Sequence, residues 1–204
     1  MKTVYITTLL IIFYCFSGCK DLSINVIDSN HFYPLAIGNY WNYQSINYDS
    51  LGNAEYDSSL YEEKVIGDTI LAGEKWFNLK LTTPSLNGTI AYKNSAVGLI
   101  MQTDGVMFKY PLVYKYPATI NDVFSDSVKV IALNEMTSTL AGSFNCLVYQ
   151  QVHPYLSGWL YINTYVSPGV GKVKMEGLLT TDKTKFVKWG ELTLMDYKVK
   201  FETK

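Results

Sequence analysis

Few residues of this chain have the types and spacing that catalysis or metal binding requires. The 204 residues include only 2 His and 3 Cys. His31 and His153 stand far apart, and His153 precedes Pro154 in a predicted loop. A structural zinc site needs four such ligands, and the Gly-x-Ser-x-Gly turn that exposes a serine nucleophile is absent from the sequence. We therefore expect no metal, no cofactor and no nucleophilic catalysis.

Acidic side chains offer the remaining route to catalysis, because a pair of carboxylates can hydrolyse a glycosidic bond. Glu62 and Glu63 are adjacent in sequence. In a strand, adjacent side chains point to opposite faces and cannot act together. Asp122 and Asp126 have the surroundings of turn and cap residues. We expect that the protein is not an enzyme, and a carboxylate hydrolase is the least favoured alternative.

Aromatic side chains are abundant, with 17 Tyr and 4 Trp. On an open face they could stack on sugar rings or line an apolar groove. Packing in the core is the alternative role. The two densest clusters are the predicted ligand-binding residues, namely Tyr110, Tyr114 and Tyr116 in the first and Trp159, Tyr161 and Tyr165 in the second.

Charge excludes one class of partner. All 17 basic residues are Lys, and with 18 Asp and Glu the net charge is −1. Proteins that bind nucleic acid through phosphates need a basic surplus, so no nucleic acid is expected. The absence of Arg also removes the two-pronged guanidinium contact to carboxylate or phosphate.

The first 18 residues have the form of a secretory leader. Lys2 supplies the positive charge, Val4 to Phe16 form an apolar run, and the small residues Ser17 and Gly18 follow. The run is shorter than the roughly 20 residues that span a bilayer. A buried first strand is the alternative interpretation.

Phe16-Ser17-Gly18-Cys19 resembles the lipobox of bacterial lipoproteins. The resemblance implies cleavage before Cys19 and attachment there of a diacylglyceryl group and a further acyl chain such as palmitate. Several acyl chains anchor a protein stably, whereas one would not. Lys20-Asp21 partly resembles the export tract of surface lipoproteins, and an ordinary polar tether is the alternative interpretation. The expected location is the outer membrane of a Gram-negative bacterium, on its periplasmic face or at the cell surface.

The rest of the chain has the pattern of a β-sheet protein. β-Branched and aromatic residues number 77 against 8 Ala, and apolar residues often recur with period two. The alternation changes phase at Leu194-Met195, which predicts a β-bulge. Ala72-Gly73, Asn87-Gly88 and Asp104-Gly105 predict hairpin turns. We expect an all-β domain made of a single curved antiparallel sheet of about ten strands, either an open half-barrel or a meander.

Three segments resemble a loosely defined group of secreted bacterial domains, the TapB-like and neighbouring uncharacterised lipoproteins. They are the Pro-Leu-x-x-Gly-Asn-x-Trp-x-Tyr pattern within 32–43, the Ala-Gly-x-Phe-x-Cys pattern within 140–146, and Pro-Gly-Val-Gly-x-Val-Lys within 167–174. The resemblance implies an open half-barrel like that of LolA/LolB-type lipoprotein carriers. The functions of these relatives are mostly unknown.

These observations divide the chain into a leader at 1–18, a lipidated Cys and tether at 19–31, and a β domain at 32–204. The predicted function is that of a non-catalytic, membrane-anchored envelope lipoprotein that binds a lipid, a glycan or a protein partner. A structural accessory of an envelope complex is the main alternative.

Overall fold

The computed structural model describes residues 28–55, 59–85, 87–102, 112–125 and 127–202. The predicted leader, Cys19 with most of its tether, Asp104-Gly105 and Tyr110 lie outside these ranges. Within them, the secondary structure consists of one short 3-10 helix and twelve strands: η1 (Ser29–His31), β1 (Tyr40–Asn47), β2 (Ser59–Leu71), β3 (Glu74–Thr82), β4 (Asn87–Ser95), β5 (Gly98–Met101), β6 (Leu112–Lys115), β7 (Val123–Phe124), β8 (Val128–Thr139), β9 (Gly142–Tyr155), β10 (Gly158–Ser167), β11 (Gly171–Thr180) and β12 (Val187–Lys198).

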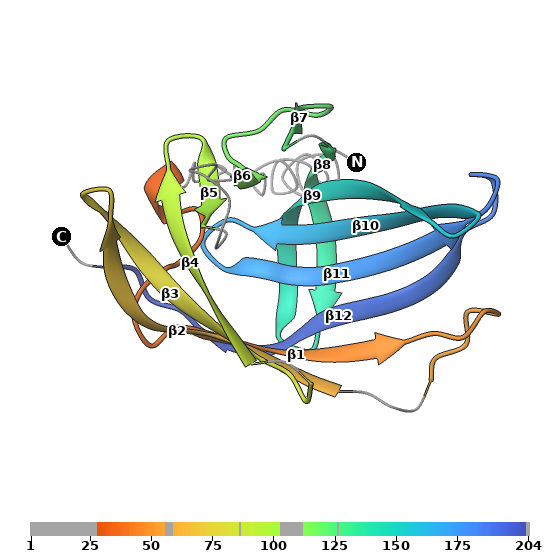
Figure 1. Cartoon of the computed structure of the whole chain (residues 1–204), viewed down its shortest axis with the longest axis horizontal. Coiled ribbons are helices and arrows are strands. Elements are labelled where there is room, and N and C mark those ends of the chain that lie inside the picture. Colours follow the sequence, from red (N-terminus) through yellow and green to blue (C-terminus); the bar gives the residue numbers. More distant parts are fainter. Residues whose placement is uncertain (1–27, 56–58, 86, 103–111, 126, 203–204) are drawn as a thin grey trace, which may run out of the picture.

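All twelve strands belong to one antiparallel sheet, in the order β6-β5-β4-β3-β2-β1-β12-β11-β10-β9-β8-β7 (Figure 1). The all-β single sheet is thus confirmed, and the expected number of about ten strands is too low. The strands β5, β6 and β7 have only 4, 4 and 2 residues. Such short segments show no alternation that could reveal them.

The sheet curls into a nearly closed barrel, which corrects the expected open half-barrel. Its two edge strands are β6 and β7, and β6 is joined to β9 and to the residue that follows β7. The Tyr149 hydroxyl donates to the Lys115 carbonyl at 2.6 Å, and the Ser125 hydroxyl donates to the Leu112 carbonyl at 2.5 Å. The rings of Tyr149 and Tyr114 lie 5.1 Å apart. A sheet that meets itself in this way encloses an interior.

The predicted bulge is present where β12 pairs with β1. Asn42 lies opposite Asp196 and Tyr43 opposite Leu194, so Met195 is the extra residue. The Ala72-Gly73 turn between β2 and β3 is also confirmed. Its residues have φ values of 51° and 79°, as a two-residue turn matched to strand twist requires. The Asn87-Gly88 prediction was wrong, because both residues belong to β4.

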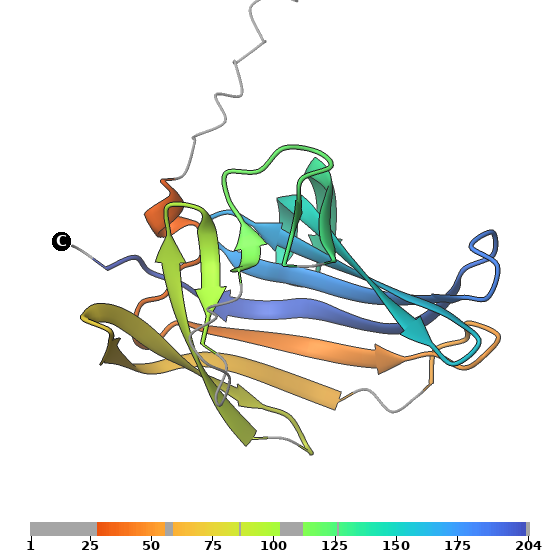
Figure 2. The same ribbon diagram turned by 45° about the horizontal axis from the view of Figure 1, so that its top comes forward.

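The segment before β1 fills one end of the barrel. Phe32, Tyr33 and Leu35 are all buried. The Asn39 side chain donates to the carbonyls of Pro34 (2.6 Å) and Lys200 (2.9 Å), which ties this segment to the chain beyond β12. Figures 1 and 2 show η1 at this end and the β9–β10 and β11–β12 turns at the other. The Pro-Leu-x-x-Gly-Asn pattern therefore has a structural role as a plug.

We expect Gly98→Ala to lower the free energy of unfolding by about 1–3 kcal/mol, because φ at this position is +128°, a conformation nearly restricted to glycine. An added Cβ would also lie 2.0 Å from the Tyr114 carbonyl oxygen. Urea unfolding measures the change. Gly88→Ala is the matched control, because nothing lies within 4 Å of its added Cβ. Equal unfolding midpoints for both variants would contradict this account of β5.

Candidate functional site

A buried carboxylate lies at the centre of the barrel interior. Glu63 on β2 is only 4 % exposed. It accepts hydrogen bonds from the hydroxyls of Tyr33 (3.3 Å) and Tyr61 (3.1 Å). The Tyr43 hydroxyl lies 3.5 Å from the carboxylate and donates to the Lys172 carbonyl at 3.0 Å. The Lys172 ammonium forms an ion pair with Glu63 at 2.5 Å. The carboxylate thus has a full set of partners, which a buried charge requires.

The Glu63–Lys172 pair connects strands that are not neighbours in the sheet. Glu63 belongs to β2 and Lys172 to β11, with β1 and β12 between them. The ammonium also lies 5.0 Å from the ring centroid of Tyr43 and 5.2 Å from that of Tyr61. Both contacts have the geometry of cation–π interactions. The pair therefore bridges the interior and fixes the separation of the two strands.

Burial raises the pKa of Tyr33 and of Tyr43 well above the usual value, and the nearby Glu63 charge raises both further. The same two causes, in the same order, raise the pKa of Tyr61. All three hydroxyls therefore keep their protons at neutral pH and remain hydrogen-bond donors, Tyr33 and Tyr61 to the carboxylate and Tyr43 to the Lys172 carbonyl.

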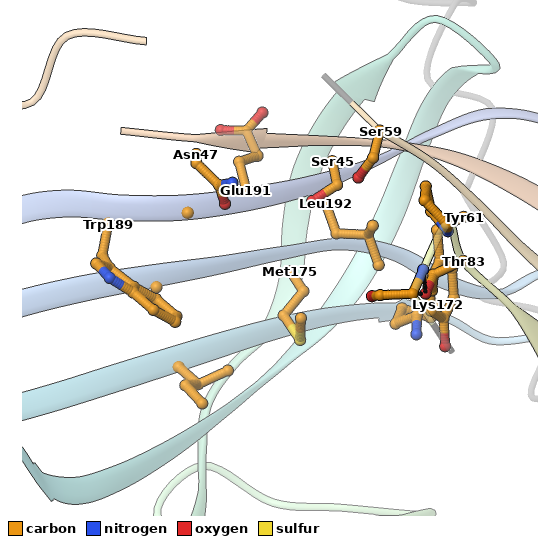
Figure 3. A pocket seen from close by; sticks show the side chains of 15 residues that line it. Ser45, Asn47, Ser59, Tyr61, Thr83, Lys172, Met175, Trp189, Glu191 and Leu192 are labelled. Atoms are coloured by element: carbon orange, nitrogen blue, oxygen red, sulfur yellow. Dashed lines mark hydrogen bonds between the residues drawn. The ribbon is translucent and has the colours of Figure 1, made fainter. Parts of the chain in front are cut away.

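A cavity of about 450 Å³ extends from Lys172 and Tyr61 along the inside of the sheet, and we call it the trough. Figure 3 shows Lys172 and Tyr61 at one end, Trp189 at the other, and Met175 and Leu192 between them. One wall is polar and uncharged, with Ser45 and Asn47 from β1 and Ser59 from β2, whereas the floor of Ile162, Met175 and Leu192 is apolar. Its volume is typical of sites for small ligands.

Trp189 reaches the trough because of a bulge between β11 and β12. Gly177 lies opposite Gly190 and Leu178 opposite Lys188, so Trp189 is the extra residue. Bulges commonly redirect a side chain in this way. A Cβ added to Gly177 would lie 3.0 Å from the indole ring, so the ring packs directly on the glycine. The side chain is nevertheless 46 % exposed.

A second cavity, of about 610 Å³, lies beyond Trp189 at the end of the barrel opposite the plug. Its aromatic lining comes from Tyr48, Tyr155 and Trp159 as well as Trp189, and Tyr155 and Trp189 have ring centroids 6.3 Å apart. Trp189 lines both cavities. The trough and the second cavity therefore meet at this ring.

The first predicted aromatic cluster belongs to the core near the plug. Tyr114 lines a small cavity of about 30 Å³ beside Glu63. Tyr116 stacks on Phe32, with ring centroids 4.6 Å apart and an interplanar angle of 10°. Tyr110 lies outside the described residues. These two tyrosines support the interior and do not line the trough.

The second predicted cluster lies on β10, and only Trp159 lines one of the two large cavities. Lys183 lies 4.7 Å from the Trp159 ring centroid. Tyr161 makes an edge contact with Phe186, and the Tyr165 hydroxyl donates to Glu176 at 2.6 Å. No described member of either cluster lines the trough. Trp159 of the second cluster lines the second cavity, and Tyr114 of the first cluster lines the small cavity.

The sequence analysis missed Glu63, Lys172 and Trp189. A signal for Glu63 was present, because it alternates with Tyr61 and Val65 and so lies on an apolar face. Glu62 and Glu63 do point to opposite faces, as expected, but Glu63 acts with Lys172 rather than with a second acid. Trp189 and Lys172 lie beside bulges, which single-strand alternation does not reveal.

His153 lies in β9 opposite Leu160 rather than in a loop. Among the described residues, no group of three His, Cys, Asp or Glu side chains is placed to hold a metal ion. No helix in the described ranges has the length and apolar character that crossing a membrane requires.

Comparisons with known proteins identify relatives in fold only. No family model and no curated protein sequence matches the chain. Solved structures do match, and two of them each have a TM-score of 0.53 over 83 % of this chain and 99 % of theirs. One is a “putative lipoprotein” of Parabacteroides distasonis at 18 % identity, and the other is a “putative exported protein with YmcC-like fold” of Bacteroides fragilis at 14 % identity.

The chain shares the fold of these two proteins. The nearly closed barrel and the twelve-stranded sheet agree with this likeness. The resemblance of its motifs to TapB-like domains and LolA/LolB-type carriers stays a prediction.

We expect Glu63→Gln to lower the free energy of unfolding by about 3 kcal/mol, because it leaves the Lys172 charge buried without its counter-ion. The double variant Glu63→Gln/Lys172→Met should recover most of the loss. Urea unfolding measures both. Glu202→Gln, which removes an exposed partner of Lys75, is the control and should cost under about 1 kcal/mol. A Glu63 loss no larger than the control would refute the role of the pair.

Proposed function

We propose that this chain is a non-catalytic lipoprotein of the outer membrane of a Gram-negative bacterium, anchored through acyl chains on Cys19 and facing the periplasm or the cell surface. The leader and the Phe16-Ser17-Gly18-Cys19 motif support the anchor. The fold shared with a putative lipoprotein and a putative exported protein of Gram-negative bacteria supports an envelope location. The β domain at 32–204 is then the part that carries the function.

We propose further that the β domain binds a ligand in the trough. The observation that carries this proposal is a 450 Å³ cavity that combines an uncharged polar wall with an apolar floor. A ligand that has both polar and apolar surface fits such a lining. A lipid, a glycan or a segment of a partner protein could each supply that surface.

The charged groups of the trough support binding rather than catalysis. Lys172 is engaged by Glu63, and Glu191 by Lys188 and by the Thr193 hydroxyl. A general acid or base must be free to exchange a proton with the substrate. The charges at the trough instead hold the barrel together.

We expect Cys19→Ala to abolish incorporation of radiolabelled palmitate in growing cells, because it removes the thiol to which the diacylglyceryl group is attached, and the cleavage and amino acylation that follow depend on that attachment. The label is measured by autoradiography of the immunoprecipitated protein. Cys146→Ala is the control and should keep the label, since Cys146 is buried in the β domain. Equal labelling of wild type and Cys19→Ala would disprove the anchor.

We expect the protein isolated from its own membranes to carry a bound small molecule, seen by native mass spectrometry as a mass above that of the denatured chain. Ser45→Trp should abolish this adduct, because Ser45 lines the trough and an indole there would fill it. Leu60→Trp is the control and should retain the adduct, because the Leu60 side chain on β2 is 67 % exposed and does not line the trough. A wild-type protein without any adduct would count against the binding function.

A further inference from the structure

The polar wall of the trough consists of side chains that have no partner within the described protein. Ser45 lies directly opposite Ser59 across the β1–β2 ladder, and Asn47 follows two residues along β1 on the same face. None of the three side chains forms a hydrogen bond with another described residue. Two hydroxyls and one amide therefore present free donors and acceptors to whatever occupies the trough.

Each charged side chain among the described residues that line the trough already has a partner. The Lys172 ammonium, at its inner end, is paired with the Glu63 carboxylate. Glu191, whose strand forms part of the lining, is paired with Lys188. An anionic headgroup would have to displace Glu63 from Lys172 and leave that carboxylate buried without its counter-ion, which is unfavourable. The lining therefore favours an uncharged ligand.

Trp189 supplies a flat apolar surface at the end of the trough where Asn47 lies (Figure 3). Its ring rests on Gly177, and Gly190 beside it also lacks a side chain. The ring is half-exposed at the junction of the two cavities. A pyranose ring has a face of C–H groups that can stack on an aromatic ring and a rim of hydroxyls that need hydrogen-bond partners.

We propose that the trough binds an uncharged glycan, one sugar ring of which stacks on Trp189 beside Asn47, while the next unit along the trough bonds to Ser45 and Ser59. The proposal rests on the binding function proposed above and names the ligand class. Further sugar units extend past Trp189 into the second cavity, where Tyr48 and Tyr155 offer more aromatic surface.

An acyl chain fits the same lining less well. It would cover the apolar floor of Met175 and Leu192, but it would also remove water from Ser45, Asn47 and Ser59. Buried polar groups without partners are costly. A glycan satisfies both surfaces of the trough.

The test uses the purified full-length protein in a detergent without a sugar headgroup. Uncharged hexasaccharides of glucose, mannose, galactose and N-acetylglucosamine are titrated by calorimetry, with palmitate as the lipid probe. We expect at least one hexasaccharide to bind and palmitate to bind more weakly. Trp189→Ala should weaken sugar binding at least tenfold, and Asn47→Ala several-fold.

Two further variants separate the role of the ring from general damage. Phe186→Ala removes an aromatic side chain of similar exposure, 48 % against 46 % for Trp189, outside both cavity linings, and should bind sugar as wild type does. Trp189→Phe keeps an aromatic ring and should restore part of the affinity. Circular dichroism checks that each variant is folded.

Three outcomes would overturn the proposal, and they distinguish it from the binding function. Sugar binding that is unchanged in Trp189→Ala and Asn47→Ala places the glycan elsewhere. Tight palmitate binding, or a lipid as the native adduct, without any sugar binding overturns the glycan and leaves the binding function standing. No bound probe and no native adduct would remove both proposals.

Discussion

A carboxylate can remain inside a β-barrel only if enough donors surround it, and Glu63 imposes that requirement on much of this interior. The hydroxyls of Tyr33 and Tyr61 and the Lys172 ammonium meet it. These donors come from the plug segment, β2 and β11, so one group determines how three parts of the chain come together. The tyrosine content of the sequence follows from the same need, since a Tyr ring fills apolar space while its hydroxyl serves a polar centre.

The barrel has two unlike ends as a result. At one end, the plug residues and the Glu63 cluster leave a cavity of only about 30 Å³. Beyond Lys172, the inward residues of β1 and β2 become the small Ser45 and Ser59, and glycines appear on β11 and β12. Larger side chains at these positions would have continued the core. Their small size leaves space for the trough.

Local patterns in the sequence predicted what depends on a single strand. The alternation identified the long strands, and the change of phase at Met195 located a bulge because both halves of that strand are regular. The short strands β5 to β7 carry too few residues for any pattern. Asn87-Gly88 has the composition of a turn, but the pairing of β4 with β3 begins at that point and draws both residues into the strand.

The candidate site was less predictable, because it depends on how strands are paired. Trp189 lines the trough because β12 has one extra residue at this point, between Lys188 and Gly190, which pair with consecutive residues of β11. The partner of Glu63 lies 109 residues further along the chain. Tyr114 and Tyr116, by contrast, were recognised as aromatic neighbours, but their ring partners Tyr149 and Phe32 come from distant segments and place them in the core.

The strand order has a consequence for how the chain folds. Every ladder joins strands that are consecutive in sequence except β1–β12, where Trp41 pairs with Tyr197. The sheet is thus two six-stranded meanders, each of which can assemble by successive hairpins with short loops to close. The ladder that unites them requires closure of a loop of about 150 residues, and such non-local pairing slows folding. The second meander and this ladder can therefore be completed only after β12 has been synthesised.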